Sequence, residues 1–447
     1  MEEQKPQNIH KTAIRSNPKK SKHLVAQSLV EKYQIITISG DSTSTIYVYD
    51  NGIYIEGEKI LRKELQEMYE EEATSGVKSE VIVKIQDMTH MSLKETQRDH
   101  YNLIPLNNGV FDLHTSEIID YKSDYYFFAK LPVVYNPEAK CPAHKKFFSE
   151  IIDEKDLRLI QELFGFCLYR KIFLKKAFIL VGEKNTGKST FLKALTNMLG
   201  LKNISGVSLQ KLSNDKFAIG NLFRKYANIY DDLDSQGINN HGAFKIASGG
   251  GIVSGEKKFG DEFQFINYAK SIFACNKIPD VKDIDDDAYF DRWILLNFNQ
   301  NIQKIDPFLD EKLNTKEEVS GLLNWSIGGL KRLLKYKTFS NYMTSEDTKL
   351  SMLKNSNSIS SFSQDWLKSD SESPFMLNAE LYEAYRLYCL QFNLAMQSDI
   401  KFHRDIERYA PYAIKNTSAL NKLAKQMRGY SGVRIDMSGT DDEVVDY

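Results

Sequence analysis

The sequence predicts an α/β protein of several domains, and three observations carry that prediction. At 447 residues the chain exceeds what one hydrophobic core usually serves. Four short apolar runs recur between residues 177 and 298, separated by helical or loop segments, which is typical of a largely parallel sheet flanked by helices. The first run leads into a glycine-rich loop and then a helical pattern.

Composition excludes several classes of protein. With 42% hydrophobic and 27% charged residues the chain is typical of an ordinary globular protein, and no apolar run approaches the roughly 18 residues of a membrane span. Its polar start does not resemble a secretory signal, so we expect a cytoplasmic location in a prokaryotic or viral host cell and no membrane partner. Net charge is -1, so any contact with nucleic acid must be local.

The cysteines favour neither a zinc site nor a disulfide framework, because they are far apart and form no CxxC pair. They are Cys141, Cys167, Cys275 and Cys389.

The first 24 residues predict a basic flexible arm. Such a segment is more often a solvated tail than a phosphate contact. Its cations are Lys5, Lys11, Arg15, Lys19, Lys20 and Lys22.

A small α+β domain is expected over residues 25–97. Residues 33–57 alternate apolar and polar side chains around a turn at 50–52, which predicts short antiparallel strands, and 58–72 have helical spacing. No paired-carboxylate strand of a polymerase or primase centre is present there.

Residues 102–121 predict a second hairpin, with Asn108 and Gly109 as its turn. Residues 153–170 predict an amphipathic helix. Its expected apolar side consists of Leu157, Ile160, Leu163, Phe164 and Leu168.

Another helix, over residues 317–336, closes the sheet region. Its expected inward side chains are Leu322, Leu323, Trp325, Ile327, Leu330 and Leu334. The Ser/Asn/Thr-rich stretch 338–374 weakens the periodic signal and is expected to contain the next boundary. Helices over 378–395 and 404–414 and a strand at 432–437 would then complete a small module of winged-helix size.

The strongest motif is "GEKNTGKS" at residues 182–189, which matches G-x-x-x-x-G-K-[ST] between an apolar strand and a helix. The two glycines let backbone N–H groups converge on phosphates, Lys188 would reach the β- and γ-phosphates, and Ser189 would hold Mg²⁺. The candidate ATP-binding residues are Gly182, Glu183, Lys184, Asn185, Thr186, Gly187, Lys188, Ser189 and Thr190.

The second candidate site is the strand end "YANIYDDLD". An acidic residue there binds Mg²⁺ in P-loop enzymes, here Asp231, and Asp232 would orient or deprotonate the attacking water. The alternative is a solvated turn with spare acids, since Asp234 follows.

Two further strand-associated residues complete the set. Asn276 ends the run "AKSIFACN", where its amide could sense the γ-phosphate, although it could also be a strand-ending turn. Arg292 precedes "WILLNF" and could stabilise transition-state charge on a neighbouring subunit's ATP. A structural ion pair to Asp291 or to an acid within 285–287 is the competing interpretation.

Residues 249–270 predict a hairpin with Lys257, Lys258 and Phe259 at its tip. Two cations and an aromatic ring suit phosphate contact and base stacking in single-stranded nucleic acid, although many basic tips serve only solubility.

In this order the motifs resemble superfamily 3 helicases. Within that superfamily, the chain is most similar to the phage, plasmid and mobile-element branch, which includes the satellite-phage and poxvirus primase-helicases. The segments that carry this similarity are "NLIPLNNGVFDLHTSEIIDY" and "FGFCLYRKIFLKKAFILVGEKNTGKST". The resemblance covers roughly 100–400 and is strongest over 160–298.

The resemblance implies an AAA+-type ATPase core that uses ATP and Mg²⁺, hexamers encircling DNA and 3′-to-5′ translocation. It makes 98–170 a pre-ATPase region with collar-like helices, 171–340 the ATPase domain and 341–447 a winged-helix-like domain. It makes Asn276 the sensor, Arg292 the finger and Lys257 with Lys258 the DNA-tracking hairpin. Many relatives end the acidic strand in Asp-Glu or a lone Glu, so which of Asp231 and Asp232 is the base stays open.

The predicted function is thus an ATP-dependent DNA helicase in replication of a mobile element. Its partners would be single-stranded or forked DNA and further copies of itself, with a replication initiator, a primase or host replisome proteins as further candidates. Two alternatives stay open: an origin-binding initiator that uses ATP for assembly, and a P-loop motor or switch that acts on protein.

Overall fold

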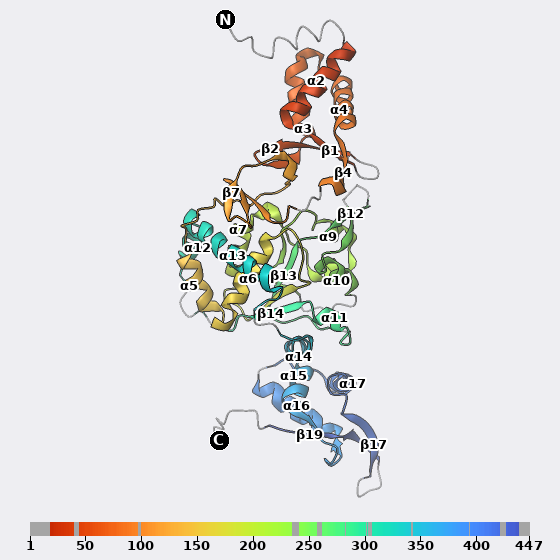
Figure 1. Ribbon diagram of the computed structural model, residues 1–447. Helices are drawn as coiled ribbons and strands as arrows, with labels where there is room; N and C mark the ends of the chain where they lie inside the picture. The colour runs from red at the N-terminus through yellow and green to blue at the C-terminus, as the bar shows by residue number, and fades with distance from the viewer. Residues whose placement is uncertain are drawn as a thin grey trace. The chain divides into compact units, whose positions relative to one another are not determined.

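The computed structural model describes residues 18–39, 44–96, 100–234, 241–256, 262–281, 283–300, 302, 306–340, 343–392, 394–420 and 426–437. The chain folds into two compact units (Figure 1). The first unit consists of Met1–Asp231, Gly242–Ala274 and Leu296–Tyr342, and the second of Asp232–His241, Cys275–Leu295 and Met343–Tyr447. Helices and several separate sheets make this a mixed α/β fold, as predicted.

A small sheet and three helices form the N-terminal part of the first unit. The sheet order is β3-β2-β1-β4, from strands β1 (Ile36–Ser39), β2 (Ser44–Asp50), β3 (Ile53–Glu56) and β4 (His90–Ser92). The pairs β1–β2 and β2–β3 are antiparallel, which confirms the predicted strands. The helices are α2 (Pro18–Tyr33), α3 (Glu58–Tyr69) and α4 (Ser75–Thr89), with the short η1 (Glu70–Glu72) and η2 (Leu93–Thr96).

The predicted arm over residues 1–24 ends earlier than expected, because α2 already begins at Pro18. Helix formation carries Val25 and Leu29 into the core of the small domain, where they pack with Leu61 and Ile85. Burial of these side chains favours a helix over a solvated tail. Residues 1–17 lie outside the described part of the chain.

Three antiparallel strands follow, β5 (Leu103–Leu106), β6 (Gly109–Asp112) and β7 (Glu117–Ile119). The predicted hairpin is confirmed, but its turn is wrong by one residue: Leu106 pairs with Gly109, so residues 107–108 form the loop. Gly109 has a φ of +142°, and a Cβ there would lie 2.5 Å from Ile118 Cγ2. This glycine is therefore required by contact with β7.

Helices α5 (Pro142–Ile151), α6 (Leu157–Leu168) and α13 (Lys316–Tyr336) support the central sheet. The helix predicted over 153–170 is present, and Ile160, Leu163, Phe164 and Leu168 of its expected apolar side are buried. It is shorter than expected at both ends, and nearly all of its sides are buried rather than one. Even Glu162 is buried, where it accepts hydrogen bonds from Arg332 Nε at 2.5 Å and Ser340 N at 2.7 Å. On α13, Leu333 rather than Leu334 is fully buried.

Close approach of α6 and α13 depends on glycine. A Cβ at Gly165 would lie 2.4 Å from the backbone of both Ser326 and Leu330. We expect Gly165→Ala to lower the free energy of unfolding by about 1–3 kcal/mol, because the helices must separate. The measurement is urea unfolding, with Gly328→Ala as the control, since a Cβ there meets only the Gln161 side chain at 3.2 Å. Equal losses in both variants would contradict the prediction.

The central sheet has the order β14-β8-β13-β10-β9. Its strands are β8 (Ala177–Val181), β9 (Ile204–Ser205), β10 (Ala227–Tyr230), β13 (Lys270–Cys275) and β14 (Trp293–Asn297). Four of them are the predicted apolar runs, and β10 pairs in parallel with both β9 and β13. The helices of the first unit along this part of the chain are α7 (Lys188–Leu199), α8 (Leu209–Asn214), α9 (Lys216–Gly220), α10 (Gly242–Ser248) and α12 (Leu309–Leu313). Helix α11 (Asp287–Phe290) belongs to the second unit.

The second unit includes a C-terminal module of helices and short strands. Its helices are α14 (Ser345–Ser356), α15 (Ser358–Asp365), α16 (Asn378–Gln391) and α17 (Asp399–Tyr409). Its strands are β15 (Leu367–Ser369), β16 (Met376–Leu377), β17 (Ile414–Leu420), β18 (Gln426–Ser431) and β19 (Val433–Ile435). Phe362, Tyr385, Phe402 and Tyr430 lie in its core.

The helices predicted over 378–395 and 404–414 and the last strand are present, although α17 begins five residues earlier than expected. The stretch 338–374, in which the next boundary was expected, contains the division between the two units, between Tyr342 and Met343, and it also contains α14 and α15. Its polar residues cap the helices: Thr344 accepts a hydrogen bond from Asp347 N, and Asn357 accepts one from Ser360 N.

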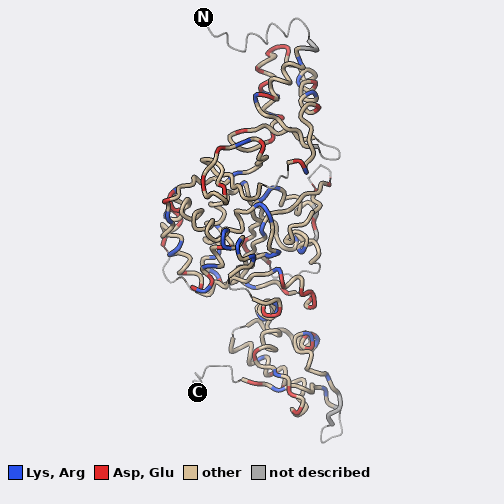
Figure 2. Tube along the Cα trace, viewed as in Figure 1, with Lys and Arg blue, Asp and Glu red and all other residues tan. Residues whose placement is uncertain are grey.

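Charged residues of both signs are interspersed along the trace (Figure 2). No helix among the described residues is long and apolar enough to cross a membrane. All four cysteines are buried, and none of them forms a disulfide bond. No group of three or more His, Cys, Asp or Glu side chains in the described ranges is placed to hold a metal ion.

Candidate nucleotide-binding site

The glycine-rich loop joins β8, which ends at Val181, to α7, which begins at Lys188. Asn185 and Gly187 have φ values of +63° and +90°, in the left-handed region that turns successive N–H groups toward one concavity. A Cβ at Gly182 would lie 2.4 Å from the carbonyl oxygen of Phe298. The chain therefore has the strand–loop–helix context predicted for this motif.

Lys188 is buried at the start of α7, with 8% of its surface exposed. Its Nζ donates hydrogen bonds to the carbonyl oxygens of Gly182 at 2.5 Å and Glu183 at 2.7 Å. Thr186 Oγ1 donates to the same Glu183 oxygen at 2.9 Å. The ammonium group is thus held against the loop that would enclose phosphates. Ser189 beside it is exposed, as are Glu183, Lys184 and Asn185, whereas Thr190 is half-buried.

The acidic pair follows β10 directly. Asp231 and Asp232 are both exposed, whereas Leu233 is buried. Asp232 has a φ of +66°, a conformation that costs non-glycine residues roughly 1–2 kcal/mol and that Asp tolerates better than most. The carboxyl ends of the parallel neighbours β10 and β13 meet at one edge of the sheet.

Asp232, Asn276 and Arg292 belong to the second unit, whereas the loop residues and Asp231 belong to the first. Asn276 directly follows β13 and is exposed. Arg292 Nη1 donates a hydrogen bond to the carbonyl oxygen of Ala288.

Electrostatics around Arg292 involve two neighbouring acids. Burial lowers the pKa of Arg292, and the nearby carboxylates of Asp291 and Asp286 partly offset that effect. Asp286 also faces His241 Nδ1 at 3.1 Å, and it accepts a hydrogen bond from Tyr289 N at 3.2 Å. Asp291 and Asp286 are among the acids that the ion-pair interpretation names as partners of Arg292.

The predicted hairpin is present as β11 (Ile252–Glu256) and β12 (Glu262–Ile266), paired antiparallel. Its predicted DNA-contacting residues, Lys257, Lys258 and Phe259, lie outside the described part of the chain. The stem packs on the core: Phe223 contacts Phe263 and Phe265, with ring centroids 5.2 Å apart in each case.

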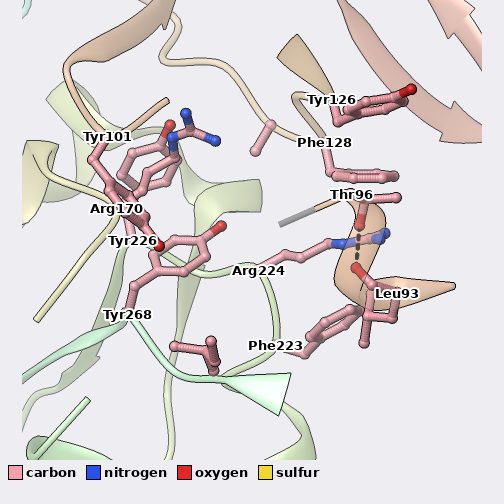
Figure 3. Close-up of a pocket in the computed structure, with 12 residues that line it drawn as sticks. Leu93, Thr96, Tyr101, Tyr126, Phe128, Arg170, Phe223, Arg224, Tyr226 and Tyr268 are labelled. Carbon is pink, nitrogen blue, oxygen red and sulfur yellow. Dashed lines mark hydrogen bonds between the residues drawn. The ribbon is translucent and has the colours of Figure 1, made fainter. Parts of the chain in front are cut away.

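Sequence reasoning missed a cavity of about 90 Å³ in the first unit that contains two arginines, Arg170 and Arg224 (Figure 3). Its lining comes from Leu93, Thr96, Tyr101, Tyr126, Phe128, Ala129, Arg170, Phe223, Arg224, Tyr226, Ile266 and Tyr268. No local pattern unites stretches so far apart, so the sequence offers no signal for it.

Comparison with known families identifies two regions of the chain. Residues 8–153 match the family model described as "D5 N terminal like", and residues 180–292 match a "Family of unknown function (DUF5906)". Each model covers less than half of the chain. No curated protein matches the sequence.

Comparison with solved structures gives the same fold over most of the chain. An A-form apo structure of the NrS-1 C terminal region (305–718) is 12% identical, with a TM-score of 0.50, and the match covers 92% of this chain and 99% of that one. A second A-form apo structure is 11% identical, with a TM-score of 0.49 and coverage of 91% and 98%. The chain thus joins a D5 N terminal like region to a region that matches DUF5906, on a mixed α/β fold shared with the NrS-1 C terminal region.

Proposed function

We propose that the chain is an ATP-driven DNA helicase of the superfamily 3 type, related to phage primase-helicases and active in replication of a phage, plasmid or other mobile element. The observation that carries this proposal is the loop at residues 182–189, in which a left-handed glycine, a close backbone approach and a buried lysine meet between β8 and α7. The D5 N terminal like match ahead of the loop and the DUF5906 match across the motifs support it.

The residues present fit a bound nucleotide and magnesium ion. Any side chain at Gly182 would fill the space beside Phe298, and Lys188 lies where it can exchange the carbonyls of Gly182 and Glu183 for phosphate oxygens. Ser189 and Asp231 would hold Mg²⁺ through oxygen atoms. When bound, ATP with Mg²⁺ supplies a phosphoryl group that water can attack.

Asp232 would orient the attacking water or accept its proton, as a carboxylate at the end of a strand can. Asn276 would hydrogen-bond the γ-phosphate or the water. Arg292 of an adjoining copy in a ring would stabilise charge in the transition state, and Lys257 with Lys258 would move DNA along the central pore. Hydrolysis at the interface between copies would thereby drive translocation in the 3′-to-5′ direction.

The test uses the purified full-length chain. We expect its ATP hydrolysis to rise when single-stranded DNA is added, and we expect it to unwind a forked duplex with a 3′ tail faster than one with a 5′ tail. Hydrolysis that DNA does not stimulate, together with absence of unwinding, would refute the proposal. Sequence-specific duplex binding that survives Lys188→Ala without unwinding would instead indicate an origin-binding initiator.

A further inference from the structure

The cavity missed by sequence reasoning has the features of an anion site. It lies wholly within the first unit, and aromatic side chains line much of it, including Tyr101, Phe128 and Tyr268 (Figure 3). Its volume of about 90 Å³ exceeds the roughly 10–15 Å³ that one water molecule needs, so a small anion such as phosphate can enter.

Arg224 is the more unusual of the two cavity arginines. Its backbone has a φ of +59°, and its guanidinium carbon lies 3.2 Å from the ring centroid of Phe128 and 4.6 Å from that of Phe223. The guanidinium group thus lies between the rings of Phe128 and Phe223 (Figure 3). Nη2 of Arg224 is buried and has no hydrogen-bond partner among the described residues. Burial lowers the pKa of Arg224.

Arg170 and Tyr226 add two more unpartnered polar atoms. Arg170 Nη2 donates a hydrogen bond to the carbonyl oxygen of His100 at 2.8 Å, but its Nε is buried without a partner in the described structure. The hydroxyl group of Tyr226 is also buried and unpartnered there. Tyr268 lies close to both guanidinium groups, which lower its pKa against the rise that burial causes.

Three buried donors without partners call for a ligand. Leaving a buried donor without a hydrogen bond is destabilising, and more so when the donor is charged. Among the described residues, no carboxylate lies within ion-pair distance of Arg170 or Arg224. The nearby Glu56 and a hydrogen bond with Tyr47 offset only part of the effect of burial on Arg224, whose pKa is lowered. The planar fork of arginine suits the oxygens of a phosphate group.

We propose that this cavity binds a phosphate group, with Arg224 Nη2, Arg170 Nε and the Tyr226 hydroxyl as donors. The phosphate could belong to a single-stranded nucleic acid or to a free nucleotide. Position favours the nucleic acid, because Ile266 at the end of β12 lines the cavity and Tyr268 follows two residues later, so the hairpin returns directly to it. This choice of source rests on the proposed helicase function, whereas phosphate binding does not.

The experiment measures binding of inorganic phosphate to the full-length Lys188→Ala chain by calorimetry, at ionic strength matched with sodium chloride. That background weakens the glycine-rich loop as a competing phosphate site. We expect binding in this background, and we expect Tyr226→Phe or Arg224→Gln to weaken it by about tenfold or more, as for a hydrogen bond to a charged group. Arg62→Gln is the control, since Arg62 forms an exposed ion pair with Glu58 at 2.8 Å in the same unit.

Tyr226→Phe is the most informative variant because it keeps the buried ring. Among the described residues, the Tyr226 hydroxyl group has no hydrogen-bond partner when no ligand is bound. Its removal should therefore leave the melting temperature of the unliganded chain unchanged or raise it. Marked destabilisation, or phosphate binding that is absent or unchanged in both variants, would overturn the proposal and leave a cavity filled by water only.

Two further titrations identify the source of the phosphate. Weaker binding of a single-stranded oligothymidine in Tyr226→Phe would support a backbone phosphate, whereas unchanged oligothymidine binding with weaker binding of AMP would support a free nucleotide. A further outcome is a parent chain that binds phosphate without unwinding DNA. If Tyr226→Phe and Arg224→Gln then still weaken phosphate binding, the phosphate site stands and only the helicase proposal fails.

Discussion

Lys188→Ala should reduce the turnover number for ATP hydrolysis by at least about 100- to 1000-fold, the range seen when one preorganised donor to developing charge is removed. The physical reason is the position of the ammonium group, which is buried and held by the Gly182 and Glu183 carbonyls at the mouth of the loop. No other cation of the loop is buried, since Lys184 is exposed. The measurement is steady-state phosphate release at saturating ATP and single-stranded DNA.

Lys193→Ala is the matched control for this loss. Lys193 lies five residues further along α7, carries the same charge and forms an exposed ion pair with Asp310 at 2.6 Å. Exposed pairs contribute about 0–1 kcal/mol, so this variant should keep both its stability and its hydrolysis rate. If Lys188→Ala hydrolysed ATP as fast as Lys193→Ala, the loop at 182–189 would not be the hydrolytic site.

Arg292→Ala should reduce the turnover number by about 10³-fold or more while ATP still binds, because an arginine finger acts on the transition state rather than on the ground state. Arg292→Lys should recover little, since a lysine cannot present the planar fork. Nucleotide affinity, measured separately by fluorescence titration, should stay within about threefold of the parent value, a change of under 1 kcal/mol.

Mixing experiments separate a finger from an ion pair. An Arg292→Ala copy keeps its own loop lysine, and a Lys188→Ala copy keeps its own arginine, so mixed rings should contain interfaces at which both are present. Activity should therefore reappear when the two inactive proteins are combined. The ion-pair interpretation with Asp291 or Asp286 predicts lower stability in Arg292→Ala and no recovery on mixing. Arg386→Ala is the control, because Arg386 forms an exposed pair with Glu383 at 2.7 Å.

Much of the fold could be predicted because the signals are local. The runs that became β8, β10, β13 and β14 are short, apolar and bounded by turns, and no other regular structure buries such segments as well. The loop at 182–189 could be placed for the same reason, since its glycines, lysine and serine are contiguous.

Errors arose where one residue type serves two roles. Gly109 was expected to form a turn, but it is required by contact with Ile118 on β7. Thr344 and Asn357 lie in the stretch that was expected to weaken the periodic signal and contain a boundary, but they cap two helices. Whether such a residue ends an element or begins one depends on partners that a single sequence does not reveal.

The amino-acid sequence by itself determined the glycine-rich loop between β8 and α7, the order of the sheet strands along the chain and the hairpin between β10 and β13, because each is encoded within one continuous segment. Only the tertiary structure decided that α6 would be buried on nearly all sides and that Arg170 and Arg224 would share one cavity. Segments from residue 93 to residue 268 meet there, and long-range packing of this kind leaves no periodic pattern in the chain.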